Sequence, residues 1–83
     1  MMYILSITAT KNDVDKELMF WAREQSEQLS EAKAIKKLQV DGWMVNEIKS
    51  VALTKIDDYF PPCLSYDAFV KAQKEGVAYR VLD

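Results

Sequence analysis

Hydrophobic and polar residues alternate along residues 2–9, MYILSITA, which is the pattern of a β-strand with one buried face. Residues 15–24 allow two interpretations. As a helix they would leave Phe20 on the solvent side, whereas a strand that turns back at residues 12–13 would create one apolar sheet face. We therefore predict a strand, with these facing pairs: Ile7 and Leu18, Leu5 and Phe20, Tyr3 and Ala22.

The period then changes to that of a helix. Ser30 is a suitable N-cap, residues 31–38 are mostly strong helix formers, and Gly42 can end the helix in a left-handed conformation. A strand is expected from Trp43, and the alternation of its apolar residues slips near Lys49–Ser50, which indicates a β-bulge. The alternative is a hairpin that turns at the Asp-Gly dipeptide containing Gly42, but the Glu, Ala and Lys content of its first arm favours the helix.

Two consecutive prolines, Pro61 and Pro62, predict a loop over residues 54–64, because proline continues neither a helix nor a central strand. A second helix is expected over residues 65–75, with its first serine as the cap and a glycine directly after its end. Residues 77–82, VAYRVL, alternate again and predict a last strand.

The predicted order is β-β-α-β-α-β. It defines an α+β fold with a small antiparallel sheet of three or four strands and two helices on one face. A helix over residues 15–24, combined with the hairpin alternative, would give a ferredoxin-like βαββαβ order instead. Residues 1–83 have the length of one compact domain, and a hydrophobic content of 49% with 29% charged residues is that of a folded protein.

Composition limits the class of protein further. The single cysteine, Cys63, cannot form an internal disulfide, which fits a reducing compartment. No apolar run is long enough for a membrane span or a signal-peptide core, so we expect a cytoplasmic protein without membrane contact. The 11 basic and 13 acidic residues give a net charge of −2, which provides no overall attraction to nucleic acid.

Candidate chemistry is sparse. The chain contains no histidine, which removes the usual general base of a catalytic triad and, with one cysteine, the usual ligands of a zinc site. The adjacent aspartates Asp57 and Asp58 lack the spacing of a calcium-binding loop. We therefore expect no catalytic residues, no metal and no cofactor, and we predict that the protein is not an enzyme.

Three lysines, Lys33, Lys36 and Lys37, form a basic face on the first predicted helix. A solvated helix surface is the favoured interpretation of such a face. The alternative is a nucleic-acid contact, which would bind less tightly as the salt concentration rises.

A protein-binding site is predicted around the proline-containing loop. It would consist of Asp57, Asp58, Tyr59 and Phe60, because exposed aromatic side chains dominate binding energy and prolines reduce the entropy lost on docking. Trp21, on the outer face of the second predicted strand, is a further candidate contact unless a helix covers it.

The chain is similar in size, acidity and lack of motifs to small accessory proteins of phages and mobile elements, which include anti-CRISPR inhibitors. That resemblance implies an inhibitor that occupies a surface of a larger host complex. Our first hypothesis is such a module, whose acidic residues would face a basic nucleic-acid-binding surface of the partner. Those residues are Asp13, Asp15, Glu17, Asp57 and Asp58. The alternatives are the nucleic-acid contact described above and a small homo-oligomer, such as a homodimer, that pairs through the edge of its last strand.

Overall fold

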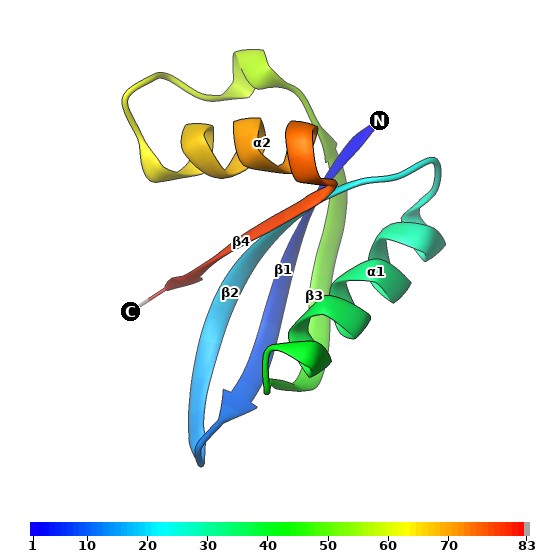
Figure 1. The fold of residues 1–83 in the computed structure, drawn as a ribbon, viewed down its shortest axis with the longest axis vertical. Coiled ribbons are helices and arrows are strands. Elements are labelled where there is room, and N and C mark those ends of the chain that lie inside the picture. The colour runs from blue at the N-terminus through cyan, green and yellow to red at the C-terminus, as the bar shows by residue number, and fades with distance from the viewer. Residues whose placement is uncertain (83) are drawn as a thin grey trace.

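The computed structural model describes residues 1–82 and contains a four-stranded antiparallel sheet with two α-helices (Figure 1). Its elements are β1 (Met2–Lys11), β2 (Val14–Arg23), α1 (Glu27–Val40), β3 (Met44–Thr54), a short 3-10 helix η1 (Ile56–Asp58), α2 (Leu64–Glu75) and β4 (Val77–Leu82). The strands lie in the order β3-β1-β2-β4. The predicted α+β class and the β-β-α-β-α-β order are both confirmed.

The β1–β2 hairpin has the predicted register. Ile7 lies opposite Leu18, Leu5 opposite Phe20, and Tyr3 opposite Ala22. The two turn residues, Asn12 and Asp13, have φ of 53° and 64°, which is the left-handed conformation that a tight two-residue hairpin requires. Residues 15–24 are therefore not helical, and the ferredoxin-like alternative is wrong.

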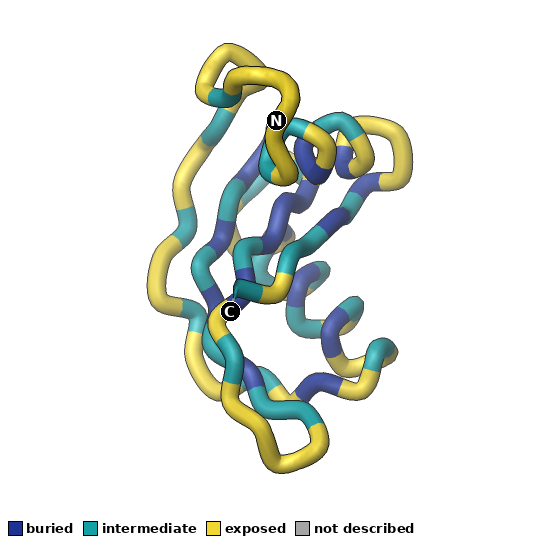
Figure 2. The backbone as a smooth tube through the Cα atoms, turned by 90° about the vertical axis from the view of Figure 1, so that its left-hand side faces the viewer, coloured by how far each residue is buried: buried dark blue, intermediate teal, exposed yellow. Residues whose placement is uncertain are grey.

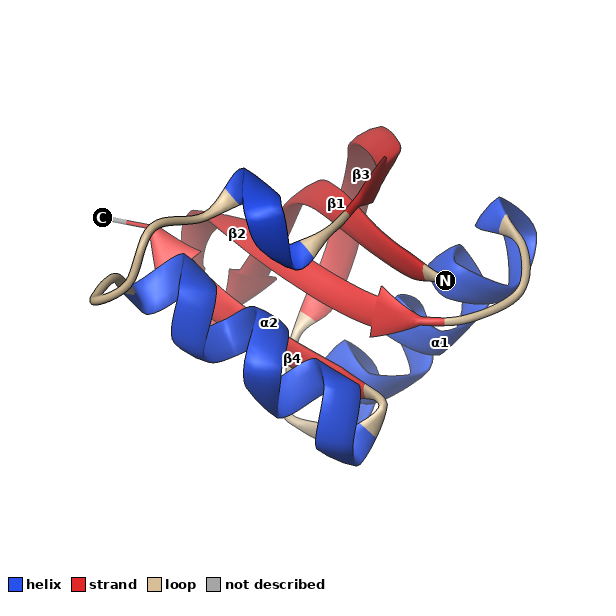
Figure 3. Ribbon diagram, turned by 90° about the horizontal axis from the view of Figure 1, so that it is seen from above, coloured by secondary structure: helices blue, strands red, loops and turns tan. Residues whose placement is uncertain are grey.

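The two helices pack on opposite faces of the sheet, so the prediction that both cover one face is wrong. Helix α1 covers a core that contains the alternate residues Leu5 and Ile7 of β1 and Phe20 of β2. Helix α2 covers a second core around Trp21, whose side chain points to the other face. The physical reason is the sequence of β2, which is apolar on both faces over residues 18–22 and needs cover on both sides. Figure 3 shows the two helices apart from each other along the sheet.

Both helices begin earlier than predicted. Ser26 caps α1, with its hydroxyl oxygen accepting from the backbone N–H of Leu29 at 3.2 Å. Ser30 lies one turn inside the helix, where it is fully buried and its hydroxyl donates to the carbonyl of Glu27 at 2.7 Å. In α2 the cap is Cys63 instead of Ser65, with its Sγ accepting from the backbone N–H of Tyr66.

Strand β3 contains the predicted irregularity and a second one. Its pairing with β1 shifts register between Ser6 and Ile7, where Lys49 is the extra residue, and between Thr8 and Ala9, where Asn46 is the extra residue. The bulge near Lys49–Ser50 is confirmed. Two glycines in left-handed conformations end the helices, Gly42 after α1 with φ +94° and Gly76 after α2 with φ +93°.

Candidate protein-binding site

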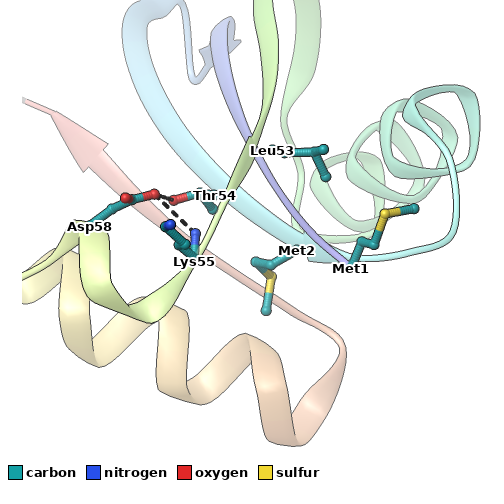
Figure 4. A pocket seen from close by; sticks show the side chains of 6 residues that line it. All are labelled: Met1, Met2, Leu53, Thr54, Lys55 and Asp58. Atoms are coloured by element: carbon teal, nitrogen blue, oxygen red, sulfur yellow. Dashed lines mark hydrogen bonds between the residues drawn. The ribbon is translucent and has the colours of Figure 1, made fainter.

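The loop between β3 and α2, residues 55–63, carries an exposed aromatic side chain, Phe60, on a base that is fixed by hydrogen bonds. Its first turn is η1. The carboxylate of Asp58 accepts from the backbone N–H of Lys55 and from the hydroxyl of Thr54, both at 3.0 Å (Figure 4). These hydrogen bonds, led by the one from the Lys55 backbone, hold the pKa of Asp58 below its usual value. Asp58 therefore closes the turn.

Tyr59 connects this turn to the core beneath α2. Its hydroxyl accepts from the indole Nε1–H of Trp21 at 3.0 Å and lies 2.8 Å from the hydroxyl of Thr54. Because the Thr54 hydroxyl donates to Asp58, the Tyr59 hydroxyl must donate to Thr54. One chain of hydrogen bonds thus runs from the buried indole through Tyr59 and Thr54 to Asp58, and each bond polarises the next.

The aromatic ring of Tyr59 packs as part of the same core. Its centroid lies 5.7 Å from that of Phe69 on α2 and 6.3 Å from that of Trp21, with the latter pair edge to face. Tyr59 is half-buried, so the prediction that its side chain projects as an anchor is wrong. Tyr59 and Phe60 are adjacent in the sequence, but consecutive side chains of an extended segment point in opposite directions. Tyr59 therefore packs on the core, and Phe60 faces solvent.

Phe60 is the side chain that projects. It is 85% exposed, more than any other large hydrophobic side chain within residues 1–82. Leu64, four residues further on, is 65% exposed, and Pro61 and Pro62 between them are exposed as well. Asp57 is exposed at the start of the loop. The predicted set of loop residues therefore divides into two that fix the loop by hydrogen bonds, Asp58 and Tyr59, and two that are exposed and form none of these bonds, Asp57 and Phe60.

An open pocket of about 370 Å³ lies at the base of the loop. Met1, Met2 and Leu53 supply its apolar side, and Thr54, Lys55 and Asp58 supply its polar side (Figure 4). Both Met1 and Leu53 are more than half exposed. The pocket therefore lies where the start of the loop meets the end of the sheet at which β1 begins.

Trp21 contributes to this site only indirectly, through the hydrogen bond from its indole N–H to the Tyr59 hydroxyl. It is fully buried under α2 and cannot contact a partner protein, so its prediction as a binding residue is wrong. From the sequence, Trp21 is expected to be exposed only if no helix covers the outer face of β2, and α2 covers that face. The signal that could have indicated this is the apolar stripe of Ala68, Phe69 and Ala72, whose small alanines let α2 approach the sheet closely.

The remaining predicted acids do not join the loop. Asp15 and Glu17 lie on the hairpin, at the other end of the sheet in Figure 1. The carboxylate of Asp15 accepts from the hydroxyl of Thr10, and Glu17 forms an ion pair with Lys49 at 3.0 Å. Asp13 occupies the exposed hairpin turn itself.

The lysine face of α1 is largely neutralised by neighbouring acids. Lys33 forms an ion pair with Glu24 and Lys37 with Asp41, both at 3.1 Å. Hydrogen bonds from the hydroxyl of Tyr79 and, second, from Lys37 hold the pKa of Asp41 below its usual value. Lys36 is exposed. This arrangement leaves little net positive charge for a polyanion.

Within residues 1–82 no group of three or more histidine, cysteine, aspartate or glutamate side chains is arranged to hold a metal ion. Cys63 is a free, exposed thiol that serves as a helix cap. Over the same residues, neither helix has the length and apolar character needed to cross a membrane. Comparison of the chain with protein families, curated proteins and solved structures gave no match.

Proposed function

We propose that this chain is a protein-binding module without catalytic activity, and that the loop of residues 55–63 is its recognition element. The observation that carries the proposal is the 85% exposure of Phe60 directly beside Tyr59, which is held by hydrogen bonds and ring contacts. An aromatic side chain in water has a large area to bury, and a fixed base lowers the entropy lost when the loop docks.

The partner would offer an apolar pocket for Phe60 with basic side chains beside it. Asp57 is exposed in the same loop, three residues before Phe60, and the chain as a whole carries a net charge of −2. Opposite charges around an apolar anchor increase the association rate and set the orientation. We propose that the partner is a larger protein and that the module covers a basic, nucleic-acid-binding surface on it. Such a module would act as an inhibitor by competing with the nucleic acid.

The first test is affinity capture from a lysate of the native host, with the tagged wild-type chain and two variants. Phe60→Ala removes the proposed anchor, and Val40→Ala is the matched control, because Val40 is 74% exposed at the end of α1. Both variants should keep the circular dichroism spectrum and unfold within about 0.5 kcal/mol of wild type, as exposed substitutions usually do. A partner that Val40→Ala captures and Phe60→Ala loses would support the proposal.

Two results would overturn it. Equal capture by Phe60→Ala and wild type would exclude the loop as the recognition element. Recovery of nucleic acid, or of proteins that disappear after nuclease treatment, would favour the face of Lys33, Lys36 and Lys37 instead. Once a partner is known, addition of its nucleic acid should release the module if the two compete for one basic surface.

A further inference from the structure

The outer edge of β3 has the features of a pairing surface. β3 is an edge strand of 11 residues that is hydrogen-bonded to β1 on its inner side only. Figure 2 shows it as the outer strand, with mostly exposed residues along its length. The opposite edge, β4, has 6 residues. It is flanked by Lys37 of α1 and Asp41 directly after α1, and by Lys71 and Glu75 of α2. β3 is therefore the longer and more accessible edge, and an accessible edge is a template for another strand.

The sequence of β3 is complementary to itself about Ile48. Residues at equal distance on either side of Ile48 match in chemistry: Met44 with Ala52, Val45 with Val51, Asn46 with Ser50, and Glu47 with Lys49. If two copies of β3 pair antiparallel about a two-fold axis at Ile48, these are the residues that lie opposite each other. Apolar residues then meet apolar ones, polar residues meet polar ones, and acids meet bases.

The direction of the side chains has the same symmetry. Val45, Ile48 and Val51 pack on the core beneath α1. Met44, Glu47, Ser50 and Ala52 lie opposite alternate residues of β1 whose side chains point to the other face. The side chains of Asn46 and Lys49 also reach that face, since they contact Thr10 and Glu17. Opposing residues of an antiparallel pair point to the same side, and every pair about Ile48 satisfies this condition.

The two bulges obey this symmetry as well. They place Asn46 and Glu47 consecutively on one face, and likewise Lys49 and Ser50. In the two-fold arrangement each bulge of one copy lies opposite a bulge of the other copy. Bulges and charges commonly protect an edge strand from pairing. Here the two bulges lie symmetrically about Ile48, and the two charged residues beside Ile48 have opposite signs. The bulges and the charges are therefore compatible with this one register and disfavour the others.

We propose that two copies of this chain pair antiparallel along β3, with the two-fold axis at Ile48, to form one continuous sheet across the dimer. Glu47 of each copy would lie beside Lys49 of the other. Glu47 forms no ion pair within residues 1–82 of its own chain, whereas Lys49 already contacts Glu17. The dimer thus gives Glu47 a partner and places Lys49 between two carboxylates. The loop of residues 55–63 follows the C-terminal end of β3 and lies outside the paired residues 44–52.

Charge exchange tests the proposal. The wild-type chain should show a mass that rises from one copy to two with concentration in sedimentation equilibrium. Glu47→Lys makes positions 47 and 49 both basic, and Lys49→Glu makes both acidic, so either variant places like charges opposite each other twice per dimer. Each should weaken self-association on the order of tenfold to a hundredfold. The double variant should restore dimers, and an equimolar mixture of the single variants should form a heterodimer.

Several outcomes would overturn the proposal. A wild-type mass of one copy at every concentration up to about 1 mM would exclude it, since pairing weaker than that is no more than a few kcal/mol of binding. Dimers that both single variants leave unchanged would place the interface elsewhere, and failure of the mixture to form heterodimers would exclude this register. Phe60→Ala should not alter the dimer, so this test is independent of the proposed recognition loop.

Discussion

Removal of one hydroxyl group, by Tyr59→Phe, should destabilise the whole fold. In the wild type the Trp21 indole N–H donates to the Tyr59 hydroxyl at 3.0 Å, and Trp21 is fully buried. No buried side-chain nitrogen or oxygen atom within residues 1–82 lacks a hydrogen-bond partner. The substitution keeps the ring and its contacts with Phe69, so it creates no cavity. It leaves the indole N–H buried without an acceptor.

The expected loss is about 1–3 kcal/mol of unfolding free energy, which is the cost of an unsatisfied buried donor. The other broken bond, to Thr54, is cheap because Thr54 still donates to Asp58 and solvent can reach it. A domain of this size has a total stability of the order of 5 kcal/mol, so the loss is a large share of it. The melting temperature should fall by roughly 5–20 °C at about 4–8 °C per kcal/mol.

The measurement is urea unfolding followed by tryptophan fluorescence and far-ultraviolet circular dichroism. With a slope of about 1 kcal/mol per molar urea for a small domain, the midpoint should fall by about 1 M or more. Tyr66→Phe is the matched control, because Tyr66 is half-buried on α2 and its hydroxyl forms no hydrogen bond within residues 1–82. Its midpoint should stay near that of wild type. If the two variants unfold at the same midpoint, the hydrogen-bond chain does not stabilise the loop.

Two further predictions concern the ends of structural elements. Asp58→Asn should lower stability at pH 7 relative to Asp57→Asn. The folded-state pKa of Asp58 lies below its unfolded value of about 3.9, so the stability that its carboxylate contributes is complete above about pH 3.9 and is lost as the pH falls through the folded pKa. The difference between the urea midpoints of the two variants should therefore be largest at pH 7 and should shrink as the pH is lowered below about 3.9. Gly76→Ala should cost about 1–2 kcal/mol because of its φ of +93°. Its added Cβ would also lie 3.1 Å from the Lys33 Nζ, whereas Gly42→Ala meets only an ordinary contact at 3.5 Å, so thermal unfolding should place Gly76→Ala lower.

The recognition site could be predicted from the sequence only in part. A short segment with Asp, Tyr, Phe and two prolines identifies an exposed loop, and Phe60 and Asp57 are indeed at its surface. The sequence does not separate Phe60 from Tyr59, because their burial depends on Trp21 and Phe69, which are distant in the chain. A local signal exists for the turn alone. Asp58 lies three residues after Lys55, which is the spacing at which the acidic residue of a capping box accepts from the backbone N–H of the N-cap residue.

The sequence by itself determined the hairpin, the strand at residues 77–82 and the class of fold. These depend on local alternation and on turn residues, and residues 12–13 place two apolar strand faces in register without further information. The C-terminal ends of both helices were determined in the same way, by glycines that accept a left-handed conformation.

Only the tertiary structure decided which face each helix covers. A strand such as β2, apolar on both sides, requires cover on two faces but does not specify which helix lies on which. That choice follows from the connections and from the close fit of small side chains such as Ala68 and Ala72 against Trp21. It also fixes the exposure of Phe60 and leaves β3 as an open edge. These are properties of residues distant in sequence that meet in space, and no local pattern encodes them.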